Sequence, residues 1–310
     1  GIFARPTALV RAVEGVSFSI KKGETFGLVG ESGCVKSTLG RLILRLIHPT
    51  EGKILFAGED ITRLNRREMK PFREKMQIIF QDPYSSLDPR MRVGSIITEP
   101  LFNKNSVTGK ERTSIAAALL ERVGLRCEDL VKYPHEFSGG QRQRIGIARA
   151  LCVRPQFILA DEPVSALDVS IQAQVINLLS DLKAEYDLSY LFISHDMGVV
   201  EVTCDRIAVM YLGSIIEIAP ADGFSINRRH PYSQALLRAV PRADPHHRKK
   251  PFAMAGDVPS PLDPPAGCCF HPRCPHTFHR CKVEKPVLRK ISGEQLVACW
   301  LNNGQGITVP

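Results

Sequence analysis

The feature that most constrains the fold of this chain is a short strand that leads directly into a glycine-rich loop and then into a helix. Residues 25–29 are apolar enough for a buried strand, the loop covers 30–38, and apolar residues recur at helical spacing over 39–47. We expect Pro49 to end that helix. This order is the setting that a phosphate-binding loop requires, because loop amides and a helix N-terminus together attract an anion.

Further apolar runs, separated by helical stretches, predict an α/β fold with a mostly parallel sheet and helices on both faces. Strands are expected at residues 77–80, 157–160 and 190–193. A hairpin is expected at 207–219, and the alternation of apolar residues with serine predicts one more strand at 16–20.

The domain organisation follows from where this alternation is interrupted. Between about residues 82 and 150 a helix is expected at 110–123, ended by Gly124, and we interpret this interval as an inserted helical subdomain. From about residue 227 onward, the chain is rich in proline, histidine and cysteine. We therefore expect a main domain over residues 1–226 and a small extension over 227–310.

Composition limits the class of protein only broadly. The net charge of +9 fits either a solvated basic surface or an anionic partner such as phosphate, a membrane surface or nucleic acid. No apolar run reaches the roughly 18 residues of a membrane helix, and no secretory signal is apparent, so we expect a soluble chain. Nine cysteines without an export signal favour a reducing compartment. The chain starts at Gly1, so we expect its natural start to be missing or processed.

The loop follows the phosphate-loop pattern G-x-x-x-x-G-K-[ST] at every fixed position except Val35, where the pattern has glycine. In such a loop Lys36 reaches the β- and γ-phosphates and Ser37 ligates magnesium. A β-branched residue in the glycine conformation costs roughly 1 to 3 kcal/mol, or about one to two decades of nucleotide affinity. The alternative is a purely structural turn. The expected nucleotide-binding residues are Gly30, Glu31, Ser32, Gly33, Cys34, Val35, Lys36, Ser37 and Thr38.

Polar residues follow three of the predicted strands. Gln81 comes after the first, and Asp161 and Glu162 end the second, at the sheet edge where open α/β folds bind ligands. There Asp161 can hold magnesium through water and Glu162 can polarise the attacking water. His195 follows the third strand and can contact the γ-phosphate. Taken alone, each residue also has a structural reading: a loop residue, a solvated strand end or a structural histidine.

The tetrapeptide Ser138, Gly139, Gly140 and Gln141 begins a predicted helix, and it distinguishes one class among phosphate-loop proteins. With this tetrapeptide the chain resembles the nucleotide-binding subunits of ATP-binding cassette (ABC) transporters. More narrowly it resembles the ATPase subunits of dipeptide and oligopeptide importers, and the match runs over nearly the whole chain. The closer match rests on residues 30–34, 80–90, 160–170 and 230–237.

The resemblance implies a fold, a cofactor and partners. The fold is that of a P-loop NTPase of the ABC type, with a mostly parallel sheet core, an antiparallel β subdomain, an inserted helical subdomain and a small cysteine-rich extension. Two ATPase subunits, this one and a second of different sequence, would bind ATP and Mg²⁺ head to tail. Two membrane permease subunits and an extracytoplasmic peptide-binding protein would complete an importer, with this chain peripheral at the cytoplasmic face of the inner membrane.

The resemblance also implies roles for individual residues. ATP would lie between the phosphate loop of one subunit and residues 138–141 of the other, with Asp168 crossing the interface. Gln81 would link the γ-phosphate and magnesium to the permeases, and His195 would act as a switch. The family's adenine-stacking aromatic residue is expected upstream of Gly1, and Phe3 is the one early aromatic residue.

Four cysteines of the extension, Cys268, Cys274, Cys281 and Cys299, follow the spacing C-x5-C-x6-C-x17-C. Thiolates suit iron–sulfur clusters or zinc, but the absence of a C-x2-C pair is against an ordinary zinc ribbon. The resemblance implies a 4Fe-4S cluster, as some peptide-importer ATPases carry one in this extension. Zinc, aided by His271, His276 or His279, and free thiols remain alternatives.

Three alternative functions remain beside a peptide-importer ATPase. Val35 is compatible with a catalytically weakened structural or regulatory partner, and nickel importers share the same ATPase pattern. An ABC ATPase acting on nucleic acid would usually have tandem cassettes or a long coiled-coil insertion, and this chain has neither. We therefore expect no nucleic-acid partner.

Overall fold

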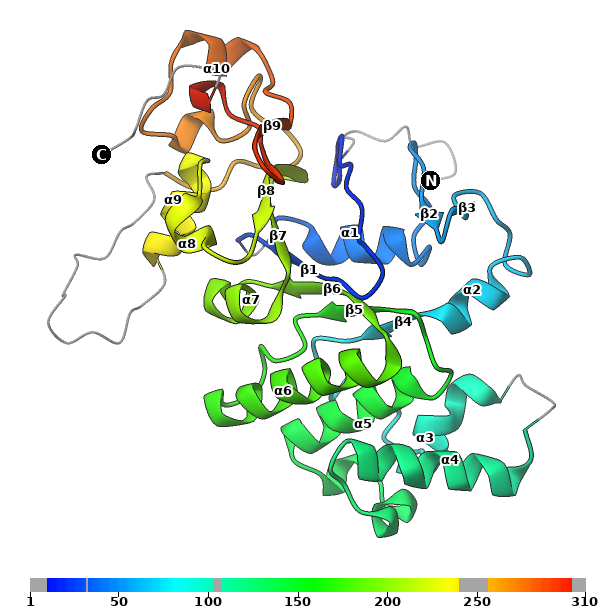
Figure 1. The fold of residues 1–310 in the computed structure, drawn as a ribbon. Helices are drawn as coiled ribbons and strands as arrows, with labels where there is room; N and C mark the ends of the chain where they lie inside the picture. Colours follow the sequence, from blue (N-terminus) through cyan, green and yellow to red (C-terminus); the bar gives the residue numbers. More distant parts are fainter. Residues whose placement is uncertain (1–9, 32, 103–106, 240–255, 303–310) are drawn as a thin grey trace, which may run out of the picture. The chain divides into compact units, whose positions relative to one another are not determined.

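The computed structural model describes residues 10–31, 33–102, 107–239 and 256–302 (Figure 1). The chain forms two compact units, and each is built from segments that are distant in sequence. The first unit contains the residues up to Ser19, Phe26–Leu39 and the chain from Ser194 onward; the second contains Ile20–Thr25 and Gly40–Ile193.

The first unit is organised around five neighbouring strands in the order β1-β7-β8-β10-β9. Strand β1 is parallel to β7, whereas β7 with β8, β8 with β10, and β10 with β9 are antiparallel. The strands are β1 (Thr25–Val29), β7 (Arg206–Tyr211), β8 (Ser214–Pro220), β9 (Arg289–Ser292) and β10 (Gln295–Val297). The helices are α1 (Lys36–Ile43), which continues into the second unit, α7 (Met197–Thr203), α8 (Phe224–Asn227), α9 (Pro231–Ala239) and α10 (His279–Val283).

The predicted hairpin is confirmed, and its turn explains the sharp reversal between β7 and β8. Leu212 and Gly213 both have positive φ, 41° and 75°, as a two-residue turn between twisted antiparallel strands requires. A Cβ at Gly213 would lie 2.3 Å from the carbonyl oxygen of Ala12, so only glycine fits there.

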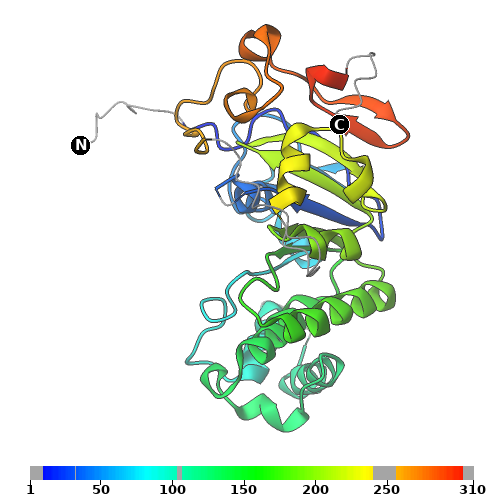
Figure 2. The same ribbon diagram turned by 90° about the vertical axis from the view of Figure 1, so that its left-hand side faces the viewer.

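The extension contributes to the same unit as the phosphate loop. Strand β10 pairs with β8 through Leu296 and Ile218, and Figure 2 shows the β9–β10 hairpin in orange-red. The carboxylate of Glu217 on β8 is fully buried and accepts hydrogen bonds from the backbone N–H of His230 and from Gln295 Nε2. The proposed boundary near residue 227 therefore marks a change of composition within one compact unit, and it remains a prediction.

The second unit contains three parallel strands in the order β4-β5-β6 and a set of helices. Strands β5 and β6 are entirely buried, whereas β4 is buried only at its two ends. Helices α3, α4 and α5 pack on one another, and α6 packs on α5 (Figure 1). The parallel strands and the α-helices of this unit are β4 (Met76–Ile79), β5 (Phe157–Asp161), β6 (Ser189–Ser194), α2 (Lys70–Lys75), α3 (Val93–Thr98), α4 (Gly109–Arg122), α5 (Gly139–Leu151) and α6 (Val169–Tyr186). Two-residue strands β2 (Leu55–Phe56) and β3 (Glu59–Asp60) form a separate antiparallel pair. The predicted α/β class, with a parallel core, antiparallel strands and a helical insertion, is confirmed.

Two expectations about local structure were wrong. Helix α1 ends at Ile43 rather than at Pro49, because Arg45 adopts a left-handed conformation with φ 55° and its buried guanidinium donates to the carbonyls of Ile61 and Leu64. No strand forms over residues 16–20; there Phe18 stacks on Phe26 at 5.0 Å instead. Among the described residues, no helix combines the length and apolar character needed to cross a bilayer.

Candidate nucleotide site and cysteine cavity

The phosphate loop connects β1 to α1, and its backbone conformation depends on positions where glycine is required. Gly33 has φ 87°, and a Cβ at Gly30 would lie 2.3 Å from the carbonyl oxygen of Met210. Val35 has φ 64°, the left-handed conformation for which the pattern has glycine. The valine therefore adopts the glycine conformation, as the sequence predicts, and strains the backbone.

Lys36 is the first residue of α1 and is only 5% exposed. Its ammonium group donates to the carbonyl oxygens of Gly30 (2.8 Å) and Glu31 (3.1 Å), so the lysine closes the loop from its own helix. Ser37 and Thr38 follow in the first turn of α1, where backbone amides attract anions. Ser32 and Phe3 lie outside the described residues.

Two residues that the sequence analysis did not assign to the site, Tyr232 and Arg273, form hydrogen bonds with Glu31 of this loop. The hydroxyl of Tyr232, in the first turn of α9, accepts a hydrogen bond from the Glu31 backbone N–H at 2.9 Å. Both terminal nitrogens of Arg273 donate to the Glu31 carboxylate, at 2.8 and 3.3 Å. Behind the loop Cys34 is fully buried, and this burial raises the pKa of its thiol. A resemblance over residues 230–237 drew attention to this region but said nothing of these contacts.

The acidic residues Asp161 and Glu162 lie in the second unit, at the end of β5. Asp161 is 5% exposed, whereas Glu162 is half-buried with φ 47°, a conformation that is rare for a residue other than glycine. The structure brings Gln81 to Glu162, and Gln81 Nε2 donates to Glu162 Oε2 at 3.0 Å. His195 follows the last residue of β6, is exposed, and belongs to the first unit with the phosphate loop.

The tetrapeptide 138–141 begins α5 as predicted and forms a reciprocal cap. Ser138 Oγ accepts from the Gln141 backbone N–H at 3.4 Å, and Gln141 Oε1 accepts from the Ser138 N–H at 3.0 Å. A serine followed three residues later by glutamine is a capping-box pattern, so this structural role was readable from the sequence. Both of these side chains are exposed, and Asp168, the exposed residue before α6, makes no side-chain cap bond.

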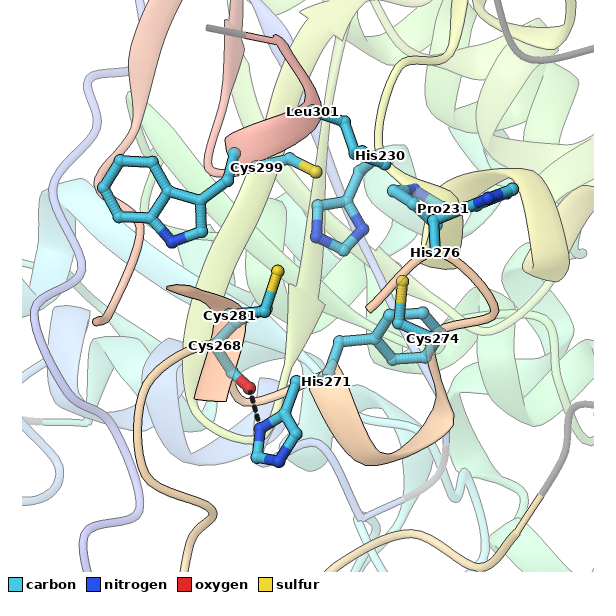
Figure 3. Close-up of a pocket in the computed structure, with 11 residues that line it drawn as sticks. His230, Pro231, Cys268, His271, Cys274, His276, Cys281, Cys299 and Leu301 are labelled. Carbon is cyan, nitrogen blue, oxygen red and sulfur yellow. Dashed lines mark hydrogen bonds between the residues drawn. The ribbon is translucent and has the colours of Figure 1, made fainter. Parts of the chain in front are cut away.

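The four spaced cysteines line one cavity of the first unit, together with His230, His271 and His276 (Figure 3). Burial raises the pKa of the thiol of Cys274 to about 11 and that of Cys299 to about 12, so these two side chains are thiols rather than thiolates at neutral pH unless a metal binds them. Cys269 and His279 do not line this cavity; the sulfur of Cys269 lies 4.0 Å from the carbonyl oxygen of Tyr211.

Two observations bear on whether this cavity fits a metal. Within the described residues, no group of three or more His, Cys, Asp or Glu side chains already has the arrangement of a metal site. His230 is 1% exposed and its Nδ1 accepts from the Tyr232 N–H, which leaves Nε2 as the protonated nitrogen. This Nε2 has no hydrogen-bond partner in the described part of the chain, although its ring faces the cysteine cavity.

Comparison with known protein families places this chain. Residues 13–165 match the family described as "ABC transporter", and residues 216–281 match "Oligopeptide/dipeptide transporter, C-terminal region". With the loop, the acidic strand end and the tetrapeptide in a fold of this kind, these matches define an ATPase of the ABC class that uses ATP with Mg²⁺. More particularly, the chain belongs to the family of ABC transporter ATP-binding proteins whose carboxy-terminal region is of the oligopeptide/dipeptide type.

Individual relatives support this assignment over nearly the full length. The chain is 52% identical over 304 residues to the oligopeptide transport ATP-binding protein AppF of Bacillus subtilis, covering 97% of this chain and 92% of AppF. It is 51% identical to the probable peptide ABC transporter ATP-binding protein y4tS of Sinorhizobium fredii, over 96% and 85% of the two chains. The ATP-binding cassette MJ0796, solved as a dimer in a post-hydrolysis state with ADP and Pi, matches with TM-score 0.64 and 29% identity over 71% of this chain and 94% of MJ0796.

Proposed function

We propose that this chain is the ATP-binding and ATP-hydrolysing subunit of an importer of di- or oligopeptides. The observation that carries the proposal is the identity of about half of all positions to relatives named for peptide transport, over 96% or more of the chain. The similarity includes the extension, which matches a region named for oligopeptide and dipeptide transporters. The proposal places the chain at the cytoplasmic face of the membrane, bound to two permease subunits.

In the proposed reaction, water attacks the γ-phosphorus of ATP, the bond to the β–γ bridging oxygen breaks, and ADP and phosphate leave. Glu162 accepts the proton of the attacking water, and its strained backbone supports a functional role, because such strain is concentrated at active sites. Gln81 donates to the same carboxylate and so orients it. Lys36 exchanges its two carbonyl partners for phosphate oxygens.

Magnesium would neutralise phosphate charge in this reaction, and Ser37, Asp161 and Gln81 supply the hydroxyl, carboxylate and amide oxygens that this hard cation prefers. His195 contacts the γ-phosphate. The tetrapeptide Ser138, Gly139, Gly140 and Gln141, whose two polar side chains are exposed, and the exposed Asp168 serve the nucleotide of a second ATPase subunit in a head-to-tail dimer.

Replacement of Glu162 tests the catalytic part of this proposal. In the transporter assembled with its partner ATPase and permeases, Glu162→Gln should lower ATP turnover by at least about 100-fold, the contribution of a general base, while ATP still binds. Glu128→Gln, an exposed carboxylate of the second unit, serves as the matched control. Turnover that stays within threefold of wild type would contradict the role of Glu162.

Uptake by membrane vesicles tests the substrate. Vesicles loaded with ATP and containing the assembled transporter should accumulate labelled di- or tripeptides, and accumulation should stop with Glu162→Gln. Accumulation of Ni²⁺ in place of peptides would instead support a nickel importer, which is the alternative substrate class.

We also propose that Cys268, Cys274, Cys281 and Cys299 hold a 4Fe-4S cluster that cross-links the extension. The residues fit such a group in two respects: their thiols share one cavity, and the unpartnered Nε2–H of His230 faces it as a donor suited to a sulfur atom. Zinc is the alternative, for which His271 and His276 also line the cavity.

Metal analysis separates these possibilities. Protein purified without oxygen should contain about four iron atoms per chain, as a 4Fe-4S cluster requires, with a broad visible absorption that Cys299→Ser abolishes. Cys269→Ser, which changes a neighbouring cysteine outside the cavity, should keep the iron. One zinc per chain without colour would support the alternative, and a colourless, metal-free protein would contradict both.

A catalytically weakened partner is the second candidate function, and the positive φ of Val35 is the observation that favours it. It predicts that this subunit binds ATP weakly at its own loop while its tetrapeptide still serves the partner's nucleotide. Replacement of Val35 by glycine, considered in the Discussion, separates this candidate from a fully active ATPase.

A further inference from the structure

We infer that Arg273 and Tyr232 are positioning residues of the phosphate loop, so that the cysteine-bearing extension completes the ATP site of this subunit. The inference rests on the proposed ATP-binding role of the loop and deepens it. Arg273 and Glu31 are 242 positions apart in sequence, yet they form an ion pair through both terminal nitrogens of the arginine.

The ion pair is largely withdrawn from solvent. The side chain of Arg273 is 6% exposed and that of Glu31 is 22% exposed, and the nearer nitrogen and oxygen are 2.8 Å apart. Most surface ion pairs contribute little, but two parallel N–H···O bonds from a buried guanidinium fix both position and orientation. Arg273 therefore fixes the side chain of Glu31, the residue that follows the first glycine of the loop.

Tyr232 holds the backbone of the same residue. Its hydroxyl accepts from the Glu31 N–H, and its ring is fully buried in an edge-to-face cluster with Tyr211 and Phe270, with ring centroids 4.7 and 5.3 Å away. Phe270 belongs to the extension and is itself 1% exposed. The hydroxyl of Tyr211 also accepts from Arg273 at 3.4 Å, which joins the two supports.

The charges in this arrangement predict whether loss of Arg273 strengthens or weakens ATP binding. Glu31 is a carboxylate within a loop whose task is to bind the anionic phosphates of ATP, so a Glu31 that had lost its arginine would oppose binding. Arg273 neutralises it. The carbonyl oxygen of Glu31 also accepts from Lys36, so any rotation of this residue moves an acceptor of the phosphate-binding lysine. Loss of Arg273 should therefore weaken ATP binding through both charge and geometry.

The position of Arg273 in the chain ties these contacts to the cysteine cavity. Arg273 ends the short 3-10 helix η4 (His271–Arg273), which lies between the cavity-lining Cys268 and Cys274. Because η4 connects these two cysteines, their positions also determine where Arg273 lies. The extension is thus part of the nucleotide site rather than an appendage beside it.

A double-mutant comparison tests the inference. In the full chain carrying Glu162→Gln to prevent turnover, the dissociation constant for a fluorescent ATP analogue is measured with and without Arg273→Ala. We expect Arg273→Ala to weaken binding about five- to tenfold, and we expect the same substitution in a Glu31→Gln background to weaken it less than about twofold. Arg280→Ala, which removes an exposed arginine paired with Glu284 in the same extension, should change nothing.

Kinetics of the assembled transporter add a readout that a general loss of folding would not give. Arg273→Ala should raise the KM for ATP about five- to tenfold while kcat at saturating ATP stays within about twofold, because the residue acts through the loop and not on the reacting atoms. Arg273→Lys should recover part of the loss, since it restores the charge but not the two-nitrogen geometry.

The possible outcomes separate the inference from the proposed function. A wild-type chain that does not bind ATP would overturn the proposed function itself. A wild-type chain that binds ATP, with Arg273→Ala equally tight, would overturn only the inference. So would an equal loss with and without the Glu31→Gln substitution, because it would reflect damage to the extension at large; thermal melting of each variant accompanies the titrations.

Discussion

At the scale of single residues, Val35 combines an unfavourable residue type with a defined conformation. The loop has φ 64° at this position, so the strain is part of the folded protein. The cost should therefore appear in folding stability as well as in the nucleotide affinity to which the motif alone assigns it.

We predict that Val35→Gly raises the free energy of unfolding by about 1 kcal/mol. Relief of about 1 to 3 kcal/mol of backbone strain exceeds the extra chain entropy of glycine, which is up to about 1 kcal/mol. Denaturant unfolding measures this, and Val35→Ala is the matched control because it keeps a Cβ at positive φ. An increase of about tenfold or more in ATP affinity or turnover would support the weakened-partner function, whereas equal turnover would contradict it.

His230 should make the protein sensitive to acid. Burial lowers the pKa of its imidazole to about 3, whereas an unfolded histidine titrates near about 6.5, so the unfolded chain binds more protons between these values. The stability that neutral His230 contributes is complete above about pH 6.5 and falls by up to about 1.4 kcal/mol per pH unit below it.

The variant His230→Asn isolates this effect, since asparagine can still accept from the Tyr232 N–H but does not titrate. Between about pH 6 and 5, wild type should lose about 1 kcal/mol more stability than the variant. Glu217, whose pKa is raised by burial, acts in the opposite direction, but it is present in both proteins. Parallel pH profiles in denaturant unfolding would contradict the assignment.

At the scale of elements, the tetrapeptide at the start of α5 stabilises this helix in two ways. Ser138 and Gln141 cap the helix, while Gly140 allows α5 to approach α6. A Cβ at Gly140 would lie 2.5 Å from Cγ2 of Ile171, closer than two non-bonded carbon atoms can approach. The glycine is therefore required for packing, independently of any contact with nucleotide.

We predict that Gly140→Ala lowers the free energy of unfolding by about 1 to 3 kcal/mol, the usual cost of overpacking. Gly146→Ala on the same helix is the control. A Cβ at Gly146 meets no atom within 4 Å, so this substitution should stabilise the protein by up to about 1 kcal/mol through helix propensity. If Gly140→Ala were as stable as Gly146→Ala, the close approach of α5 and α6 would be refuted.

At the scale of the whole molecule, the extension is integrated into the first unit. Glu217 is fully buried and accepts three hydrogen bonds from residues beyond 227: the backbone N–H groups of Arg229 and His230, and Gln295 Nε2. We predict that ending the chain at residue 226 lowers stability by at least about 5 kcal/mol, from three bonds to a charged group at about 1.5 to 3 kcal/mol each.

Thermal melting of the two truncated chains measures this. A chain ending at residue 226 should melt more than about 10 °C below the full chain, or fail to fold. A chain ending at residue 302 keeps every contact described above, so it is the matched control against which the loss at residue 226 is compared. A stable chain of residues 1–226 would instead favour the two-domain organisation expected from composition.

Much of this architecture was predictable because short-range patterns in the sequence determine each of these strands and helices. Buried strands such as 157–160 are continuous apolar runs, and the helix at 109–122 carries its own cap and terminating glycine. The end of α1 was missed because Arg45 turns the chain to reach carbonyls of residues 61 and 64, a contact that no local pattern near Pro49 reveals. The pairing of Gln81 with Glu162 was partly foreseeable, since both follow neighbouring parallel strands.

The sequence by itself determined the class of this protein, because the phosphate loop, the acidic strand end and the tetrapeptide of α5 are short motifs whose chemistry depends on near neighbours. Only the tertiary structure decided that Arg273 pairs with Glu31, that Tyr232 holds the loop backbone, and that four cysteines share a cavity with His230. These contacts join residues up to 242 positions apart. They depend on how strands β7, β8 and β10 place the extension in the first unit, and periodicity along the chain contains no record of such placement.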